Sequence, residues 1–236
     1  MQVMENIQES AAFTNSPHKE IAMTTLTKPV RPIRLYRAAL SGHAHRAELF
    51  LSLLDLPFEM IDVDLASGQQ RTPDYLAKNP FGQVPVIDDN GVVVYDSNAI
   101  LVYLARTYGE ARWMPTDIAS EVTIQQWLSL AAGPIFNGPC SARLITVFAY
   151  ALDHERAKAI SSKLFDVLEP QFAERDFALG AHVTIADVAA YSYIAHAPEG
   201  GIDLAPYPAI RGWLSRVEAL PGFVPMQRTS VSDRQN

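Results

Sequence analysis

The chain has 236 residues, 48% of them hydrophobic, which is enough for a buried core in one large domain or two small ones. Its 26 acidic and 19 basic residues give a net charge of −7, which argues against nucleic acid or an anionic membrane as a partner. A single cysteine, Cys140, excludes an internal disulfide framework, and no apolar stretch approaches the roughly 20 residues that span a bilayer. We therefore expect a cytoplasmic protein that acts on small molecules.

Residues 1–31 predict a mobile N-terminal extension. Polar side chains such as Asn6, Gln8 and Thr24 dominate this segment, and few large apolar groups are available to hold it on a core. The segment also lacks a basic start followed by a long apolar core, which is the pattern of a signal peptide.

An α/β pattern occupies residues 32–110. Residues 33–36 predict a first strand, and apolar side chains at the i, i+3, i+4, i+7 spacing predict a half-buried helix over residues 47–54. Residues 58–65 predict a second strand, and residues 73–78 predict a short helix. The alternation of strands and helices indicates an α/β domain in this half of the chain.

Residues 79–98 combine two strands, a tight turn and a helix start. β-rich residues flank Asn90-Gly91, which is a strong hairpin signal. Pro85 cannot donate to a sheet ladder, so we expect it at a strand edge or in a special turn, where a cis peptide bond after Val84 fits the pattern. That arrangement would turn the backbone N–H and C=O of Val84 outward, where they could pair with an extended peptide.

Asp96 and Ser97 precede an apolar run at residues 99–105. Ser97 suits the N-cap of a helix, and the free N–H groups of a helix start bind carboxylates. Gly109 marks the end of this helix. With the elements before it, the helix completes the order β, α, β, α, β, β, α, which predicts a four-stranded mixed sheet.

Only helical patterns follow a linker at residues 111–118, so residues 119–225 predict an all-α domain and residues 226–236 a tail. Gly133-Pro134 should kink or interrupt one helix. Thr184 and Asp187 have the spacing of a capping box ahead of another. Two apolar stripes predict further helices: Ala157, Ile160, Leu164, Val167, Leu168 and Phe172 form the first, and Ile210, Trp213, Leu214 and Val217 the second.

These motifs occur in the order of one known family. Residues 79–85 (Asn-Pro-Phe-Gly-Gln-Val-Pro) followed by Asp96-Ser97 resemble the glutathione-binding half of the soluble, cytosolic glutathione transferases. The capping box at residues 184–187 resembles the signature of that family's C-terminal domain. The resemblance extends over about residues 33–223 and points to the bacterial type with a serine-type active site. It implies a thioredoxin-like N-terminal domain, an all-α C-terminal domain and assembly as a homodimer.

Ser41 is the first candidate for catalysis, because the resembled family often places in this loop the serine that hydrogen-bonds the glutathione sulfur. A thiol with a pKa of about 8.5 is a poor nucleophile at neutral pH, and a donor near a helix N-terminus favours the thiolate. The alternative is that Ser41 only caps the following helix. Tyr36 is the second candidate for the sulfur contact, since other branches of the family use a tyrosine near that strand, although such a residue more often packs in the core.

His43 and His45 follow Ser41 closely. Either imidazole could contact the sulfur or the second substrate, and His43 is the better candidate because it is nearer to Ser41. A His-x-His metal pair is disfavoured, because residues two apart on a helix face different directions and no cysteine or carboxylate cluster completes the ligands. We therefore expect no metal site.

The resemblance also implies a set of glutathione-binding residues. Gln70 and Arg71 occupy the segment that grips the glycine carboxylate, although exposed loop arginines are usually only solvated. Val84 would pair with the cysteinyl part, and Asp96 with Ser97 would hold the γ-glutamyl group. Many relatives have glutamate in place of Asp96, so direct contact with the ammonium group is less secure here. The full set is Gln70, Arg71, Gln83, Val84, Pro85, Asp96 and Ser97.

The resemblance predicts a glutathione S-transferase that joins glutathione, its co-substrate, to small hydrophobic electrophiles, with no permanently bound cofactor. We expect the electrophile pocket between the loop at residues 38–43 and the helix around residues 127–136. A glutathione-dependent peroxidase, or a non-catalytic protein that binds glutathione or hydrophobic ligands, remains an alternative. Disulfide exchange is disfavoured because no cysteine lies at or near Ser41, and a lone cysteine such as Cys140 is usually a small buried hydrophobe.

Overall fold

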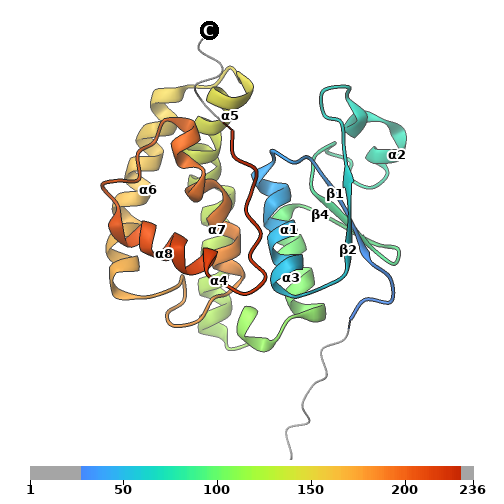
Figure 1. Ribbon diagram of the computed structural model, residues 1–236, viewed down its shortest axis with the longest axis horizontal. Coiled ribbons are helices and arrows are strands. Elements are labelled where there is room, and N and C mark those ends of the chain that lie inside the picture. The colour runs from blue at the N-terminus through green and yellow to red at the C-terminus, as the bar shows by residue number, and fades with distance from the viewer. Residues whose placement is uncertain (1–27, 230–236) are drawn as a thin grey trace, which may run out of the picture.

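The computed structural model describes residues 28–229, which form two domains with a shared hydrophobic core (Figure 1). Residues 1–27, which make up most of the predicted mobile extension, lie outside the described residues, as do residues 230–236. The N-terminal domain contains, in chain order, β1 (Ile33–Arg37), α1 (Gly42–Leu53), β2 (Phe58–Asp62), η1 (Gln69–Arg71), α2 (Pro73–Leu76), β3 (Val86–Asp89), β4 (Val92–Tyr95) and α3 (Ser97–Tyr108).

The four strands form one mixed sheet in the order β2-β1-β3-β4, which confirms the predicted fold of this domain. β1 and β2 are parallel, and the other neighbouring strands are antiparallel. Successive side chains of β1 point to opposite faces of the sheet. Ile33 and Leu35 are buried in the main core with residues of α1 and α3, whereas Tyr36 packs against a small separate cluster that contains Val86 and Tyr75 of α2.

The first strand of the hairpin begins at Val86, two residues after the start of the apolar run at residues 84–87 that predicts it. The Val84–Pro85 peptide bond is cis, and β3 starts at Val86, the first residue after the proline that can donate to a ladder. Asn90 and Gly91 both have positive φ angles, 52° and 97°, as two-residue hairpin turns require. β2 also ends at Asp62 rather than at residue 65, and α2 ends at Leu76 rather than at residue 78.

The elements of the C-terminal domain are all helical, as predicted, apart from one isolated β-bridge between Phe177 and Gly180. α4 ends directly before Gly133-Pro134, and the chain continues in one π-helical segment, η3. The predicted stripe on α6 is mostly buried, but Val167 is 53% exposed and Phe165 takes the inward position instead. The elements are η2 (Ala111–Trp113), α4 (Ile118–Ala132), η3 (Phe136–Cys140), α5 (Ser141–Phe148), α6 (His154–Glu174), α7 (Ile185–Ala195), η4 (Ala197–Gly200) and α8 (Pro208–Glu218). No helix within residues 28–229 combines the length and the apolar character needed to cross a bilayer.

The predicted capping box starts α7, the central helix of this domain. Thr184 Oγ1 accepts a hydrogen bond from the Ala186 N–H at 3.2 Å, and Asp187 Oδ2 accepts one from the Thr184 N–H at 2.9 Å. Asp187 Oδ1 also accepts from the Ala178 N–H and from the Trp213 indole N–H, at 2.8 and 2.9 Å. A single buried carboxylate therefore fixes the start of α7 against α8.

The segment after α8 returns to the N-terminal domain and runs between α1 and the helical domain (Figure 1). Ser52 Oγ of α1 donates to the Gly222 carbonyl at 2.6 Å, and His45 Nε2 lies 2.9 Å from the Val224 carbonyl oxygen. α1 and α3 also pack directly against α7. The N-terminal end of α1, which follows Ser41, therefore lies where the two domains meet.

Candidate active site

Ser41 is the N-cap of α1, with extended backbone angles of φ −85° and ψ 116°. Its Oγ accepts a hydrogen bond from the Ala44 N–H at 3.2 Å, and its own N–H donates to the Ala38 carbonyl at 2.9 Å. Within residues 28–229 the hydroxyl accepts this bond and donates to no acceptor, so its proton is available for a ligand. Capping the helix and donating to a sulfur are therefore compatible roles for Ser41.

The loop before Ser41 is held from the helical domain by Arg143 of α5. This guanidinium is 1% exposed and donates from Nη1 to the Leu40 carbonyl at 2.8 Å and from Nε to the Glu199 carboxylate at 2.7 Å. Burial raises the pKa of Glu199, but hydrogen bonds from His196, Thr229 and Arg143 outweigh that effect and lower the pKa to about 2. An ionised pair therefore fixes the loop. The sequence analysis missed it, because partners 56 positions apart leave no local pattern.

The loop at residues 83–85 is fixed through the Gln83 carbonyl. Tyr75 Oη and Asn79 Nδ2 both donate to it, at 2.9 and 2.8 Å. Val84 is half-buried, and within residues 28–229 its N–H and C=O form no hydrogen bond with another backbone group. These two groups can therefore pair with an extended ligand, and the buried Pro85 follows directly.

Asp96 is the N-cap of α3, which corrects the prediction that Ser97 takes this position. Asp96 has a positive φ of 70°, and its Oδ1 accepts from the N–H groups of Asn98 and Ala99 at 2.8 and 3.0 Å. Aspartate and serine are both favoured N-caps, so the sequence does not separate the two neighbours. Ser97 is instead the first residue of the helix and is buried, and its Oγ accepts from Arg46 Nη1 at 3.3 Å.

Gln70 and Arg71 end the short helix η1. Gln70 Nε2 donates to the Leu65 carbonyl at 3.3 Å, so the side chain turns back on its own loop. The backbone carbonyl of Gln70 lies beside Gly82, where a Cβ atom would come within 2.9 Å. The structure therefore brings η1 next to the loop that contains Gln83. Arg71 is exposed, and its contact with a carboxylate stays a prediction.

Tyr36 packs on the sheet face that α2 covers. Its ring meets Tyr75 edge-on at 6.3 Å between centres, and Lys78 Nζ lies 5.5 Å from the ring centre. The ring also lines a cavity of about 310 Å³ that Ile61 of β2 borders. These surroundings are those of a packing residue, and they favour Ser41 over Tyr36 as the sulfur contact.

His43 and His45 have different surroundings, although only one residue separates them. His45 is buried, and both of its ring nitrogens are engaged, Nδ1 with Ser192 Oγ and Nε2 with the Val224 carbonyl, each at 2.9 Å. Burial lowers the pKa of His45 to about 4. His45 therefore joins α1 to α7 and to the C-terminal segment and has no nitrogen left for a ligand. His43 is half-buried and lies beside Ser97.

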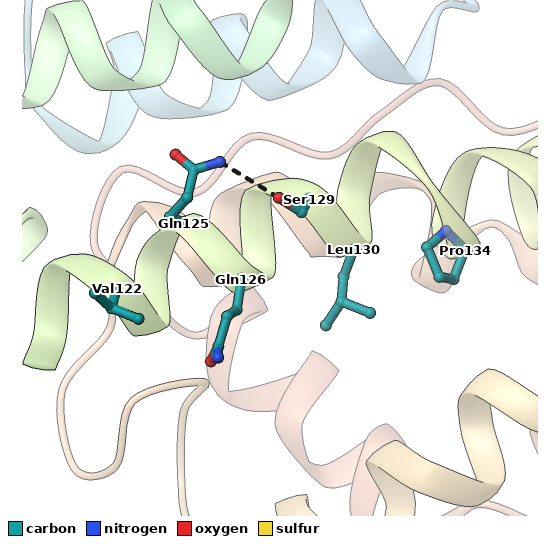
Figure 2. Close-up of a pocket in the computed structure, with 6 residues that line it drawn as sticks. All are labelled: Val122, Gln125, Gln126, Ser129, Leu130 and Pro134. Carbon is teal, nitrogen blue, oxygen red and sulfur yellow. Dashed lines mark hydrogen bonds between the residues drawn. The ribbon is translucent and has the colours of Figure 1, made fainter.

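The predicted electrophile pocket needs correction. Trp127 is 4% exposed and packs against Phe172 in the core, so it cannot line a pocket. Phe136 is 39% exposed and does face the Ser41 side, because its ring centre lies 5.9 Å from that of His43. A depression of about 430 Å³ follows a different stripe of α4 (Figure 2) and does not include the loop at residues 38–43. Its lining residues are Val122, Gln125, Gln126, Ser129, Leu130 and Pro134.

Cys140 lies in η3 and is buried, as expected for a lone cysteine in this chain. Burial raises the pKa of its thiol to about 11, so the thiol is protonated at neutral pH and is a weak nucleophile. Among the described residues, no three His, Cys, Asp or Glu side chains come together as the ligands of a metal ion would.

A thioredoxin-like domain joined to a helical domain, with a capping serine and a cis-proline loop in the first of them, defines the class of protein. Two family models match the chain: the N-terminal domain of glutathione S-transferase at residues 31–106 and its C-terminal domain at residues 148–221. The chain belongs to the glutathione S-transferase family.

Individual relatives agree with this assignment. The crystal structure of a glutathione S-transferase from Pseudomonas fluorescens has a TM-score of 0.76 and 33% identity, and covers 83% of this chain and 99% of that one. Glutathione S-transferase 3 of Zea mays is 29% identical over 81% of this chain and 91% of the relative. Disulfide-bond oxidoreductase YfcG of Escherichia coli is 28% identical over 80% of this chain and 91% of the relative.

Proposed function

We propose that this chain is a glutathione S-transferase that conjugates the glutathione thiolate to small hydrophobic electrophiles. Glutathione is the co-substrate, no cofactor is permanently bound, and the enzyme acts in the cytoplasm as a homodimer. The observation that carries the proposal is the Ser41 hydroxyl, whose oxygen caps α1 and whose proton is available to a ligand.

Glutathione binds as an extended peptide along residues 83–85. The unpaired N–H and C=O of Val84 bond to its cysteinyl part, in the manner of an added strand. Its γ-glutamyl carboxylate meets the N-terminal end of α3 at Asp96 and Ser97, because helix starts favour anions. Gln70, Arg71 and Gln83 lie on the glycine side, where a guanidinium suits the second carboxylate.

Ser41 stabilises the thiolate by donating its hydroxyl proton in a hydrogen bond to the sulfur, and the N-terminal end of α1 adds a favourable field. The sulfur then attacks an electrophilic carbon, an S–C bond forms, and a leaving group departs or a double bond is saturated. Phe136 and His43 border the approach to the sulfur from the helical domain and from α1.

We do not propose disulfide exchange through a protein thiol, although one relative is named for disulfide chemistry. The chain has serine, not cysteine, at the start of α1, and the thiol of Cys140 is buried with a pKa raised to about 11. Both observations favour chemistry in which glutathione supplies the only reacting sulfur.

A conjugation assay with a chlorodinitrobenzene and glutathione tests the proposal, and we expect turnover that saturates with both substrates. Retention on a glutathione column without turnover on a broad panel of electrophiles would instead support a binding protein. Turnover of cumene hydroperoxide without conjugation would support the peroxidase alternative.

A further inference from the structure

His43 lies between the two domains and is held from both sides. Its ring centre is 4.9 Å from that of Tyr193 on α7 and 5.9 Å from that of Phe136 on η3. On its other side, Nδ1 lies 3.1 Å from Arg46 Nη1 and 3.3 Å from Ser97 Oγ. Four elements of the fold therefore set the position of this imidazole.

Arg46 determines which nitrogen of His43 carries the proton. A guanidinium can only donate, so Nδ1 must accept, and the neutral ring carries its hydrogen on Nε2. Arg46 has little freedom to move, since it is 1% exposed and its Cζ lies 5.3 Å from the centre of the Tyr193 ring. Burial, together with the charge of Arg46, lowers the pKa of His43 to about 3, so the ring is neutral at physiological pH.

The nitrogen that carries the proton has no partner in the described part of the chain. Within residues 28–229, Nε2 of His43 forms no hydrogen bond, and the protein does not fully enclose this atom. His43 is half-buried, so this N–H keeps some access to solvent, and the ring of Phe136 beside it is 39% exposed. A fixed neutral donor beside an apolar ring suits a ligand that has an acceptor oxygen on an apolar body.

We propose that His43 binds the electrophile through its Nε2–H and selects electrophiles with a carbonyl oxygen conjugated to the reacting carbon, with Arg46 as the positioning residue. The inference rests on the proposed function and names its substrate class, the α,β-unsaturated carbonyl compounds.

The donor acts where charge develops during the reaction. When the thiolate adds to an enone, sulfur bonds to the β-carbon and the π electrons move onto the carbonyl oxygen. His43 Nε2–H donates to this enolate oxygen and stabilises it. The proton that left the thiol reaches the α-carbon through solvent, so no further reactant is required. With an alkyl halide, sulfur displaces the halide and no such oxygen exists.

Two variants of His43 test the assignment. His43→Phe keeps an aromatic ring and removes the donor, whereas the amide N–H of His43→Gln can reach the position of Nε2. For an enone, kcat/KM should fall roughly 10²-fold in His43→Phe and recover in part in His43→Gln, as for loss of one preorganised donor. For an alkyl halide, which has no carbonyl oxygen for the donor to bind, the loss of kcat/KM should be at least about tenfold smaller than for the enone. Thermal unfolding and calorimetry with glutathione show whether fold and co-substrate binding are retained.

Three results would overturn the proposal. An equal loss of kcat/KM with both electrophiles would mean that His43 acts on the glutathione sulfur and not on the electrophile. An unchanged kcat/KM with the enone would mean that His43 does not contribute to the site. Nitrogen NMR at neutral pH, with the His43 signals identified by their absence in His43→Gln, would contradict the role of Arg46 if Nδ1 carried the proton. Failure of the proposed function is distinguishable, because the unaltered enzyme would then turn over neither electrophile.

Discussion

Ser41 caps the start of α1 with its oxygen and, in our account, stabilises the glutathione thiolate by donating a hydrogen bond from its hydroxyl group. The two roles predict separate losses, one in catalytic rate and one in stability. Ser41→Ala should lower kcat roughly 10²-fold, because one preorganised donor is lost, and should lower the free energy of unfolding by about 1 kcal/mol, because α1 loses its cap. Steady-state kinetics and urea unfolding measure the two effects separately.

Thr184→Ala is the control for Ser41, because it removes the N-cap of α7 at a buried position. It should also cost about 1 kcal/mol of unfolding free energy but leave kcat unchanged. An equal loss of activity in both variants would mean that helix capping explains the effect, and Ser41 would no longer be a catalytic residue.

The half-buried His43 and the buried His45 predict a loss of stability in mild acid. The folded-state pKa values of His43 and His45, about 3 and about 4, lie below the usual value of 6.5. As pH falls below that value, the unfolded chain takes up protons first, so each histidine should cost on the order of 2 kcal/mol by pH 5. Urea unfolding at pH 7 and pH 5 measures the difference. The difference in unfolding free energy between the two pH values should be smaller in His45→Asn. It should stay the same in the control His182→Asn, which alters an exposed histidine. An unaltered difference in His45→Asn would refute this explanation.

Single-residue roles were predictable only where the partners are close in sequence. The capping box at Thr184 and the turn at Asn90 follow from neighbours within a few positions. The partners of His45 lie 147 and 179 positions away, so the sequence left its role open. Asp96 shows a further limit, because two adjacent residues with the same capping preference give no basis for choosing between them.

At the scale of elements, the Arg143–Glu199 pair joins α5 and η4 to the loop that carries Ser41. In Glu199→Gln, the buried Arg143 would lose its counter-charge, so the free energy of unfolding should fall by about 3–5 kcal/mol. We also expect a lower kcat, because Arg143 would hold the Leu40 carbonyl less firmly. Chemical denaturation and steady-state kinetics measure both effects.

Glu155→Gln is the control, since Glu155 pairs with Lys158 at the surface, where its side chain is 84% exposed. Its effect on stability should stay within about 1 kcal/mol, with kcat unchanged. If Glu199→Gln behaved like this control, the buried pair would not be what orders the loop.

The order of the elements was predictable because each has a local signal, either an apolar period or a turn. The boundaries of the elements were harder to predict near Val84-Pro85, because the apolar run there includes residues that do not join the sheet. The electrophile pocket was placed partly wrongly because a helical stripe does not reveal which of its residues the neighbouring helices cover. Trp127 proved to be a core residue, whereas Phe136 is 39% exposed and lies beside His43.

At the scale of the whole molecule, the proposed site lies where the two domains meet, with Ser41 and Val84 from one domain and Phe136 from the other. The segment after α8 bonds to α1 through the carbonyls of Gly222 and Val224 and so helps to join the domains. Buried residues of both domains form one hydrophobic cluster, so the two domains do not pack as independent units.

We expect a homodimer in solution, in keeping with the family to which the chain belongs. Light scattering coupled to size exclusion should give about twice the 26.0 kDa mass of one chain at micromolar concentration. A mass of one chain across the concentration range would contradict this expectation and would leave the active site to be formed by a monomer.

Titration calorimetry of the full chain with glutathione tests the central claim most directly. We predict saturable binding of one glutathione per chain below millimolar concentration, because the N–H and C=O of Val84 have no backbone partner among the described residues and the field at the start of α3 favours a carboxylate. Folded protein that takes up no glutathione at millimolar concentration would contradict the account.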